Sequence, residues 1–93
     1  MTVKNGAYKF INVQNITTSG SSQQSSAFGD DTRIIRVATT QDTYIELGTN
    51  PTATTSSFLM PAGSIEFLRV NPSSKIAVIQ VTTAGRISIA EIV

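Results

Sequence analysis

Short runs of β-branched and aromatic residues, interrupted by Gly, Pro or Asn about every ten residues, are the feature that most constrains the fold of this chain. Turn sequences such as Asn50-Pro51 and Asn71-Pro72 separate the runs, because proline fixes the backbone at these bends. No stretch repeats apolar residues at helical spacing. The pattern predicts an all-β fold, either a compact antiparallel β-sandwich or a small jelly-roll-like barrel of about seven strands. The predicted strands are residues 8–14, 33–39, 43–48, 57–60, 65–70, 76–82 and 86–92.

Alternation within the runs assigns side chains to the faces of the predicted sheets. Ile35 falls on the opposite side of its strand from Arg36, as in a strand with one buried face. Residues 65–70 and 76–81 are instead apolar on both faces. Such a strand is central in its sheet, or it presents its second face to a partner chain. We also predict that Ile79→Asp prevents folding, since an unpaired buried carboxylate costs several kcal/mol.

Residues 1–93 are expected to form a single domain, within which residues 17–31 make a polar loop or arm. A chain of 93 residues buries only a small core, so oligomerisation or docking on a larger surface would add stability. The loop is rich in Ser, Gln and Gly, and Phe28 is its only large apolar residue. Phe28 either folds back onto the core or anchors an arm that lies on a neighbouring subunit. We predict that deleting residues 19–27 leaves the fold intact but weakens assembly.

Charge in this chain is scarce and scattered. Charged residues make up 14% of the chain, against roughly 25% in an average soluble domain, and the net charge is +1. The basic residues form no cluster, so the chain is not expected to bind nucleic acid. Another protein can cover such a surface with little charge to desolvate, which favours an assembly component. The sequence has no long apolar run and no basic leader before an apolar segment, so we expect synthesis in the cytoplasm and no membrane partner.

The composition lacks the usual catalytic residues. Without His or Cys, Ser-His-Asp and Cys-His arrangements cannot be built, and zinc loses its preferred ligands. The acidic residues are scattered apart from Asp30-Asp31, and no glycine-rich loop is present to cradle a phosphate. We therefore expect a non-enzymatic protein with no metal and no cofactor.

Residues 33–93 resemble a group of small proteins that tailed phages and prophages encode. The shared pattern is a strand with ATxDxYIxxG, then NPTAT, an LPAGxxE bend, a KIAVIQ strand and a closing AGxxxIxE. The first 32 residues carry no such likeness. In this chain the corresponding residues are 38–45, 50–54, 60–63 with Glu66, 75–80, and 84–85 with Glu91.

The resemblance implies a non-enzymatic virion structural protein, made in the host cytoplasm and located in the phage particle. The implied role is that of a capsid cement or decoration subunit, which stabilises the phage head by bridging capsid proteins. Its partners would be the major capsid protein and further copies of the chain, as a homo-trimer or dimer. The alternative is a tail or fibre accessory protein that acts as a receptor- or glycan-binding module. The candidate interface residues are Phe28, Phe10, Tyr44, Arg36 and Arg69.

Overall fold

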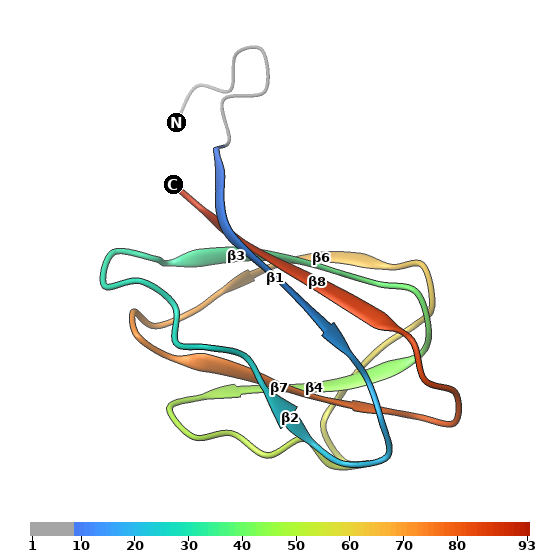
Figure 1. Cartoon of the computed structure of the whole chain (residues 1–93). Coiled ribbons are helices and arrows are strands. Elements are labelled where there is room, and N and C mark those ends of the chain that lie inside the picture. The colour runs from blue at the N-terminus through green and yellow to red at the C-terminus, as the bar shows by residue number, and fades with distance from the viewer. Residues whose placement is uncertain (1–8) are drawn as a thin grey trace.

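The computed structural model describes residues 9–93 and confirms an all-β fold (Figure 1). Eight strands in this part of the chain form two antiparallel four-stranded sheets, which pack as a β-sandwich. Residues 9–93 contain no helix with the length and apolar character needed to cross a membrane. The strands are β1 (Phe10–Thr17), β2 (Gln23–Gln24), β3 (Ile34–Thr39), β4 (Thr43–Gly48), β5 (Phe58–Met60), β6 (Ile65–Arg69), β7 (Lys75–Gln80) and β8 (Arg86–Ile92).

The strand order is that of a jelly roll. Sheet A has the order β1-β8-β3-β6, and sheet B has the order β2-β7-β4-β5. The pairs β1·β8, β2·β7, β3·β6 and β4·β5 are nested as in one long antiparallel hairpin, whose tip is the β4–β5 connection. Rolling up this hairpin adds the pairs β3·β8 and β4·β7 and sends successive nested pairs to alternate sheets. Figure 1 shows the two layers that result.

Apolar side chains that alternate along the strands fill the space between the layers. Ile35 of β3 points inward, whereas Arg36 points outward, as predicted. Both sheets and the loop before β3 contribute to this core, which therefore joins the two layers into one unit. The buried cluster consists of Phe28, Ile35, Val37, Ile45, Met60, Val70, Ile76, Val78, Ile87 and Ile89.

Polar turns fix the strand ends and explain part of the sequence pattern. In the β3–β4 turn, the Thr39 and Thr43 hydroxyl oxygens lie 2.9 Å apart, and each lies 2.8 Å from the Gln41 carbonyl oxygen. Asp42 of the same turn accepts a hydrogen bond of 2.7 Å from the Ala62 amide in the β5–β6 turn. Two turns that are far apart in the sequence are therefore held together by one carboxylate.

The first strand begins and ends later than the predicted 8–14, and Tyr8 lies outside the described residues. A bulge between Ile11 and Gln14 shifts the register of β1 on β8. Asn12, within the bulge, has a φ of 51°. Because the bulge interrupts the alternation of side chains, the period-two pattern does not locate the end of this strand.

The polar segment 17–31 is an integral part of the sandwich. It contains β2, a strand of two residues that the pattern does not predict, because two adjacent Gln residues give no alternation of apolar and polar side chains. The Ser25 amide donates to the Ile76 carbonyl oxygen at 2.8 Å, and the Ile76 amide donates to the Ser25 hydroxyl at 3.1 Å. Phe28 is 2% exposed and belongs to the core, which corrects its interpretation as an interface anchor. Since these contacts hold one edge of sheet B, we now expect deletion of 19–27 to destabilise the fold.

The two runs that are apolar on both faces occupy different places in the fold. β7 lies inside sheet B, whereas β6 is an edge strand of sheet A and has exposed outward side chains. Val78 of β7 is fully buried, but its neighbour Ile79 lies on the outward side of sheet B and is only half-buried. The expectation for Ile79→Asp therefore changes, because a carboxylate at this position can reach solvent.

Candidate interaction surface

The outward side of sheet A brings together apolar and arginine side chains from four strands. Directly paired residues of antiparallel strands point to the same face, so the register assigns each residue to a row. We use the name outer A face for the residues of these rows. The four rows are Phe10, Ile92, Ile34 and Arg69; Ala90, Arg36 and Phe67; Asn15, Ser88, Ala38 and Ile65; and Thr17 and Arg86.

Four large apolar side chains of the outer A face are open to solvent. Phe10 is 49% exposed, Ile65 is 50% exposed and Phe67 is 53% exposed. Ile34 is 37% exposed, and Ile92 between Phe10 and Ile34 is buried. Soluble monomers rarely expose a large contiguous apolar patch, and such patches mark interaction sites.

The charged residues of the outer A face are all arginines. Arg36 lies on the interior strand β3, opposite Phe67 on one side and Ala90 on the other, and is half-buried. Arg69 lies at the edge of the sheet in the register position next to Ile34. Arg86 occupies the opposite end of the face and is exposed. The face therefore combines aromatic and aliphatic surface with charge of one sign.

The structure separates the five predicted interface residues into three groups. Phe10, Arg36 and Arg69 meet on the outer A face. Tyr44 is half-buried on the outward side of sheet B, which is the other side of the sandwich. Phe28 lies in the core between the sheets. Three of the five predicted interface residues therefore lie on one surface.

Sequence reasoning missed three exposed apolar residues of this surface, namely Ile34, Ile65 and Phe67. Alternation over residues 65–70 places Ile65 and Phe67 on one side of their strand, and this was the available signal. This alternation does not show that β6 is an edge strand, and it does not show that Phe10 lies on the same face. Only the pairing of β1 with β8, of β8 with β3 and of β3 with β6 brings these side chains together.

Small side chains leave an open hollow at the polar end of the outer A face. Ala38 and Ser88 are directly paired across β3 and β8, and this leaves room beside Arg86. The hollow has a volume of about 430 Å³ and offers hydroxyl, amide and guanidinium groups. It is lined by Asn15, Ala38, Thr39, Thr40, Arg86 and Ser88.

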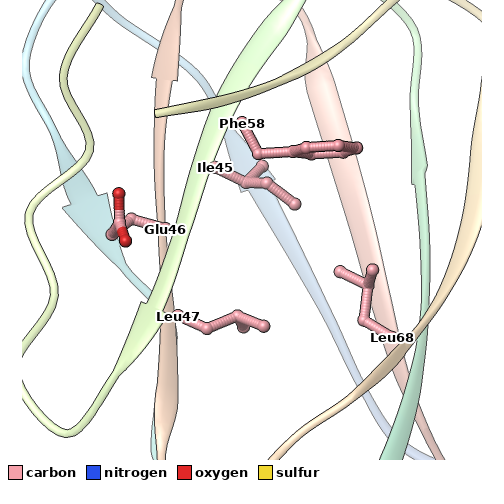
Figure 2. Close-up of a pocket in the computed structure, with 5 residues that line it drawn as sticks. All are labelled: Ile45, Glu46, Leu47, Phe58 and Leu68. Carbon is pink, nitrogen blue, oxygen red and sulfur yellow. The ribbon is translucent and has the colours of Figure 1, made fainter. Parts of the chain in front are cut away.

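A separate apolar recess opens between the sheet edges formed by β5 and β6. It has a volume of about 260 Å³. Figure 2 shows four apolar side chains around it, whereas the Glu46 carboxylate lies on the opposite side of β4. β5 pairs with only the first half of β4. Phe58, the first residue of β5, is 56% exposed. At this recess, Ile45 of the core and the Leu47 and Leu68 side chains packed against the core meet solvent. The four apolar side chains are Ile45, Leu47, Phe58 and Leu68.

One carboxylate is buried inside the sandwich. Glu91 is 2% exposed on the inward side of β8, directly paired with Ile11 and Ile35. Its Oε1 accepts a hydrogen bond of 3.0 Å from the Gly29 amide and another from the Thr32 hydroxyl. These bonds fasten the loop before β3 to sheet A, so the carboxylate supports the fold. Within residues 9–93 no group of three or more acidic residues is placed to hold a metal ion.

Most residues of the phage-like pattern act as turn and core residues. Asp42 holds the β5–β6 turn, and Glu91 holds the loop before β3. Gly85 lies so close to the β3–β4 turn that an added Cβ would be 2.7 Å from the Gln41 side chain. The pattern in residues 33–93 therefore reports on the jelly roll, and Phe10 of the outer A face lies outside it.

Comparisons with known proteins leave the identity of the chain open. No protein-family model, curated protein or solved structure matches it. The likeness of residues 33–93 to small phage proteins therefore stays a prediction.

Proposed function

We propose that the chain is a non-enzymatic virion structural protein, a capsid cement or decoration subunit that docks through the outer A face. In this role it bridges capsid proteins and stabilises the phage head. The observation that carries the proposal is the apolar surface formed by Phe10, Ile34, Ile65 and Phe67 on one side of the sandwich. The phage-like pattern of residues 33–93 supplies the virion context.

The outer A face is a suitable docking platform because its middle is rigid. Its two central strands, β8 and β3, are hydrogen-bonded on both sides, so their outward side chains are held in fixed positions. A preorganised face loses little conformational entropy on docking. Burial of its apolar area contributes roughly 25 cal/mol per Å². Many equivalent sites on a particle then turn modest single contacts into lasting attachment.

The jelly-roll topology agrees with this role but does not select it. Viral capsid domains, lectins and cupins all use this architecture, so the fold is an analogy and the surface must carry the argument. A lectin-like role in a tail or fibre is the competing function. The two roles differ in copy number and in the partner bound.

Copy number in purified particles tests the location. Quantitative mass spectrometry should find the chain in proportion to the major capsid protein, because decoration subunits occupy repeated sites on the head. Cryo-electron microscopy of the same particles should place its density on the capsid surface. Density confined to the tail, or absence of the chain from particles, would overturn the proposal.

Rebinding to particles made without the chain tests the docking surface. The purified protein should bind these particles, and Ile65→Ser should weaken binding about tenfold or more, because it removes apolar contact area. Leu59→Ser is the matched control, since Leu59 is an exposed aliphatic residue on the outward side of sheet B. It should bind like the unmodified protein. Equal loss with both variants would contradict docking through the outer A face.

A further inference from the structure

The outer A face carries positive charge without any negative charge. Its register rows contain Arg36, Arg69 and Arg86, and none of its residues is Asp or Glu. Arg36 is half-buried within the apolar part of the face, whereas Arg69 and Arg86 are exposed at opposite ends. Arg69 and Arg86 therefore flank the apolar surface, and Arg36 interrupts it.

The acidic residues of the described chain lie elsewhere. Glu66 and Glu91 share the inward side of sheet A with Val37 and Ile35, to which they are paired. Glu46 lies on sheet B, where its Oε1 accepts a hydrogen bond of 2.8 Å from a serine hydroxyl. The three aspartates lie outside the strands. The single sign of charge on the outer A face thus results from the fold, although the whole chain is close to neutral.

This charge distribution argues against a second copy as the occupant. In a two-fold contact of the outer A face with itself, residues on the central strands approach their own symmetry mates. Arg36 is on such a strand, so two guanidinium groups would be buried near one another without a counter-ion. Like charges that face one another across an interface disfavour the contact, whereas carboxylates on a partner would pair with these guanidinium groups.

The mixture of residue types favours a protein partner over a polyanion. Protein interfaces are enriched in aromatic residues and Arg and depleted of Lys, and the outer A face has Phe10, Phe67 and three arginines but no lysine. Nucleic-acid interfaces are far more positively charged than this face. Its exposed apolar side chains would also find no matching surface on a phosphate backbone.

We infer that the partner of the outer A face is an acidic protein surface, in which Asp or Glu side chains surround an apolar patch. This inference rests on the proposed function, and it specifies the chemistry of the capsid site. Carboxylates would pair with Arg36 and Arg69 next to the apolar rows. The hollow beside Arg86 gives a further acidic side chain room to approach that guanidinium.

Rebinding to particles that lack the chain provides the test. The variant Arg36→Gln/Arg69→Gln should bind about tenfold more weakly than the unmodified protein, or worse, because two charge-assisted contacts are removed. Added NaCl should weaken the binding of the unmodified protein to the particles more than it weakens the binding of this variant. Lys75→Gln removes one positive charge from sheet B, and this control variant should bind normally.

Cross-linking identifies the chemical group on the partner. The variant Arg69→Lys places an amine where a water-soluble carbodiimide can join it to a neighbouring carboxylate. Mass spectrometry should then find this position linked to Asp or Glu of a capsid protein. Lys75 on the other side of the sandwich is the internal control and should give no such link.

The possible results separate the two proposals. If the unmodified protein does not bind the particles, the proposed function fails. If it binds and the double arginine variant binds equally well, the acidic-partner inference fails and the proposed function stands. Binding of a 30-base-pair DNA duplex or of phosphatidylglycerol vesicles as tightly as of particles would also overturn the inference, since the partner would then be a polyanion or a lipid surface.

Discussion

The two outward faces of the sandwich differ in how far the chain covers them. On sheet B the outward rows are Ile79, Tyr44 and Leu59, then Gln24, Ala77 and Glu46, and we call these residues the outer B face. Ala77 is fully buried although it points outward, and Ile79 and Tyr44 are half-buried. Among residues 9–93 no comparable cover lies over Phe10 or Ile65 of the outer A face, which are 49% and 50% exposed.

Loops of the same chain account for the cover on sheet B. The Gln24 side-chain amide donates to Asn50 Oδ1 at 2.8 Å and to the Pro51 carbonyl oxygen at 2.7 Å. The Ser57 hydroxyl donates to Glu46 Oε1 at 2.8 Å. In the described part of the chain these loop contacts cover much of the outer B face, and the more exposed outer A face is the one that we propose as the docking surface.

The sharpest test of these layers is a charge placed on either side of one strand. Val78→Asp should abolish folding, because it buries a carboxylate between the sheets at a cost of several kcal/mol, comparable with the whole stability of a small domain. Ile79→Asp, one residue further on the outer B face, should fold with a lowered melting temperature. Circular dichroism on heating measures both. A folded Val78→Asp protein would refute the assignment of inward residues.

Removal of an inward carboxylate of sheet A should have the next largest effect on the free energy of unfolding. Glu91→Ala should lower the free energy of unfolding by about 2–4 kcal/mol, since it leaves the Gly29 amide and the Thr32 hydroxyl without their buried acceptor. Glu66→Ala is the matched control, because Glu66 is only half-buried and sits on the edge strand β6. It should change stability by less than about 1 kcal/mol. Urea denaturation compares the two, and equal losses would mean that Glu91 has no special structural role.

The comparison of the faces can be tested with the same substitution on each. Ile79→Ser on the outer B face should cost about 1–2 kcal/mol, because the side chain is half-buried there. Ile65→Ser on the outer A face should cost about 0.5 kcal/mol, because half of that side chain is already in water. Chemical denaturation measures both values. If Ile65→Ser proves the more damaging of the two, then the outer A face is part of the fold and is not left for a partner.

The smallest expected effect concerns self-association. Arg36→Gln/Arg69→Gln removes the like charges that oppose stacking of two outer A faces, so its dimerisation should tighten by less than about tenfold. Sedimentation velocity over a concentration series measures the shift, with Lys75→Gln as the control. An unmodified protein that already forms a tight dimer through this face would contradict the role assigned to the arginines.

Much of the fold was predictable because its determinants are local. Period-two alternation and turn residues are properties of adjacent positions, so they located seven of the eight strands and the inward side of β3. The two exceptions have different causes, one local and one not. The bulge at Asn12 breaks the alternation of β1, and β2 is held by the Ser25 contacts to β7 rather than by strand propensity.

The candidate site was only partly predictable because it is assembled from strands that are distant in sequence. The sequence predicts Phe10, Arg36 and Arg69 as separate interface residues, and nothing in the residues around each of them places the three together. The sequence around Phe28 does not distinguish a core residue from an exposed interface residue. Only the folding of the nested strands places Phe28 in the core.

The sequence by itself determined that this protein is built of short strands separated by turns, since that information lies in neighbouring residues. Tertiary structure alone decided which strand became an edge, which outward face its loops covered, and which side collected arginines without carboxylates. These features depend on strand pairing across the whole chain, from β1 with β8 to β4 with β5, and pairing over such distances is set by the cooperative packing of the core.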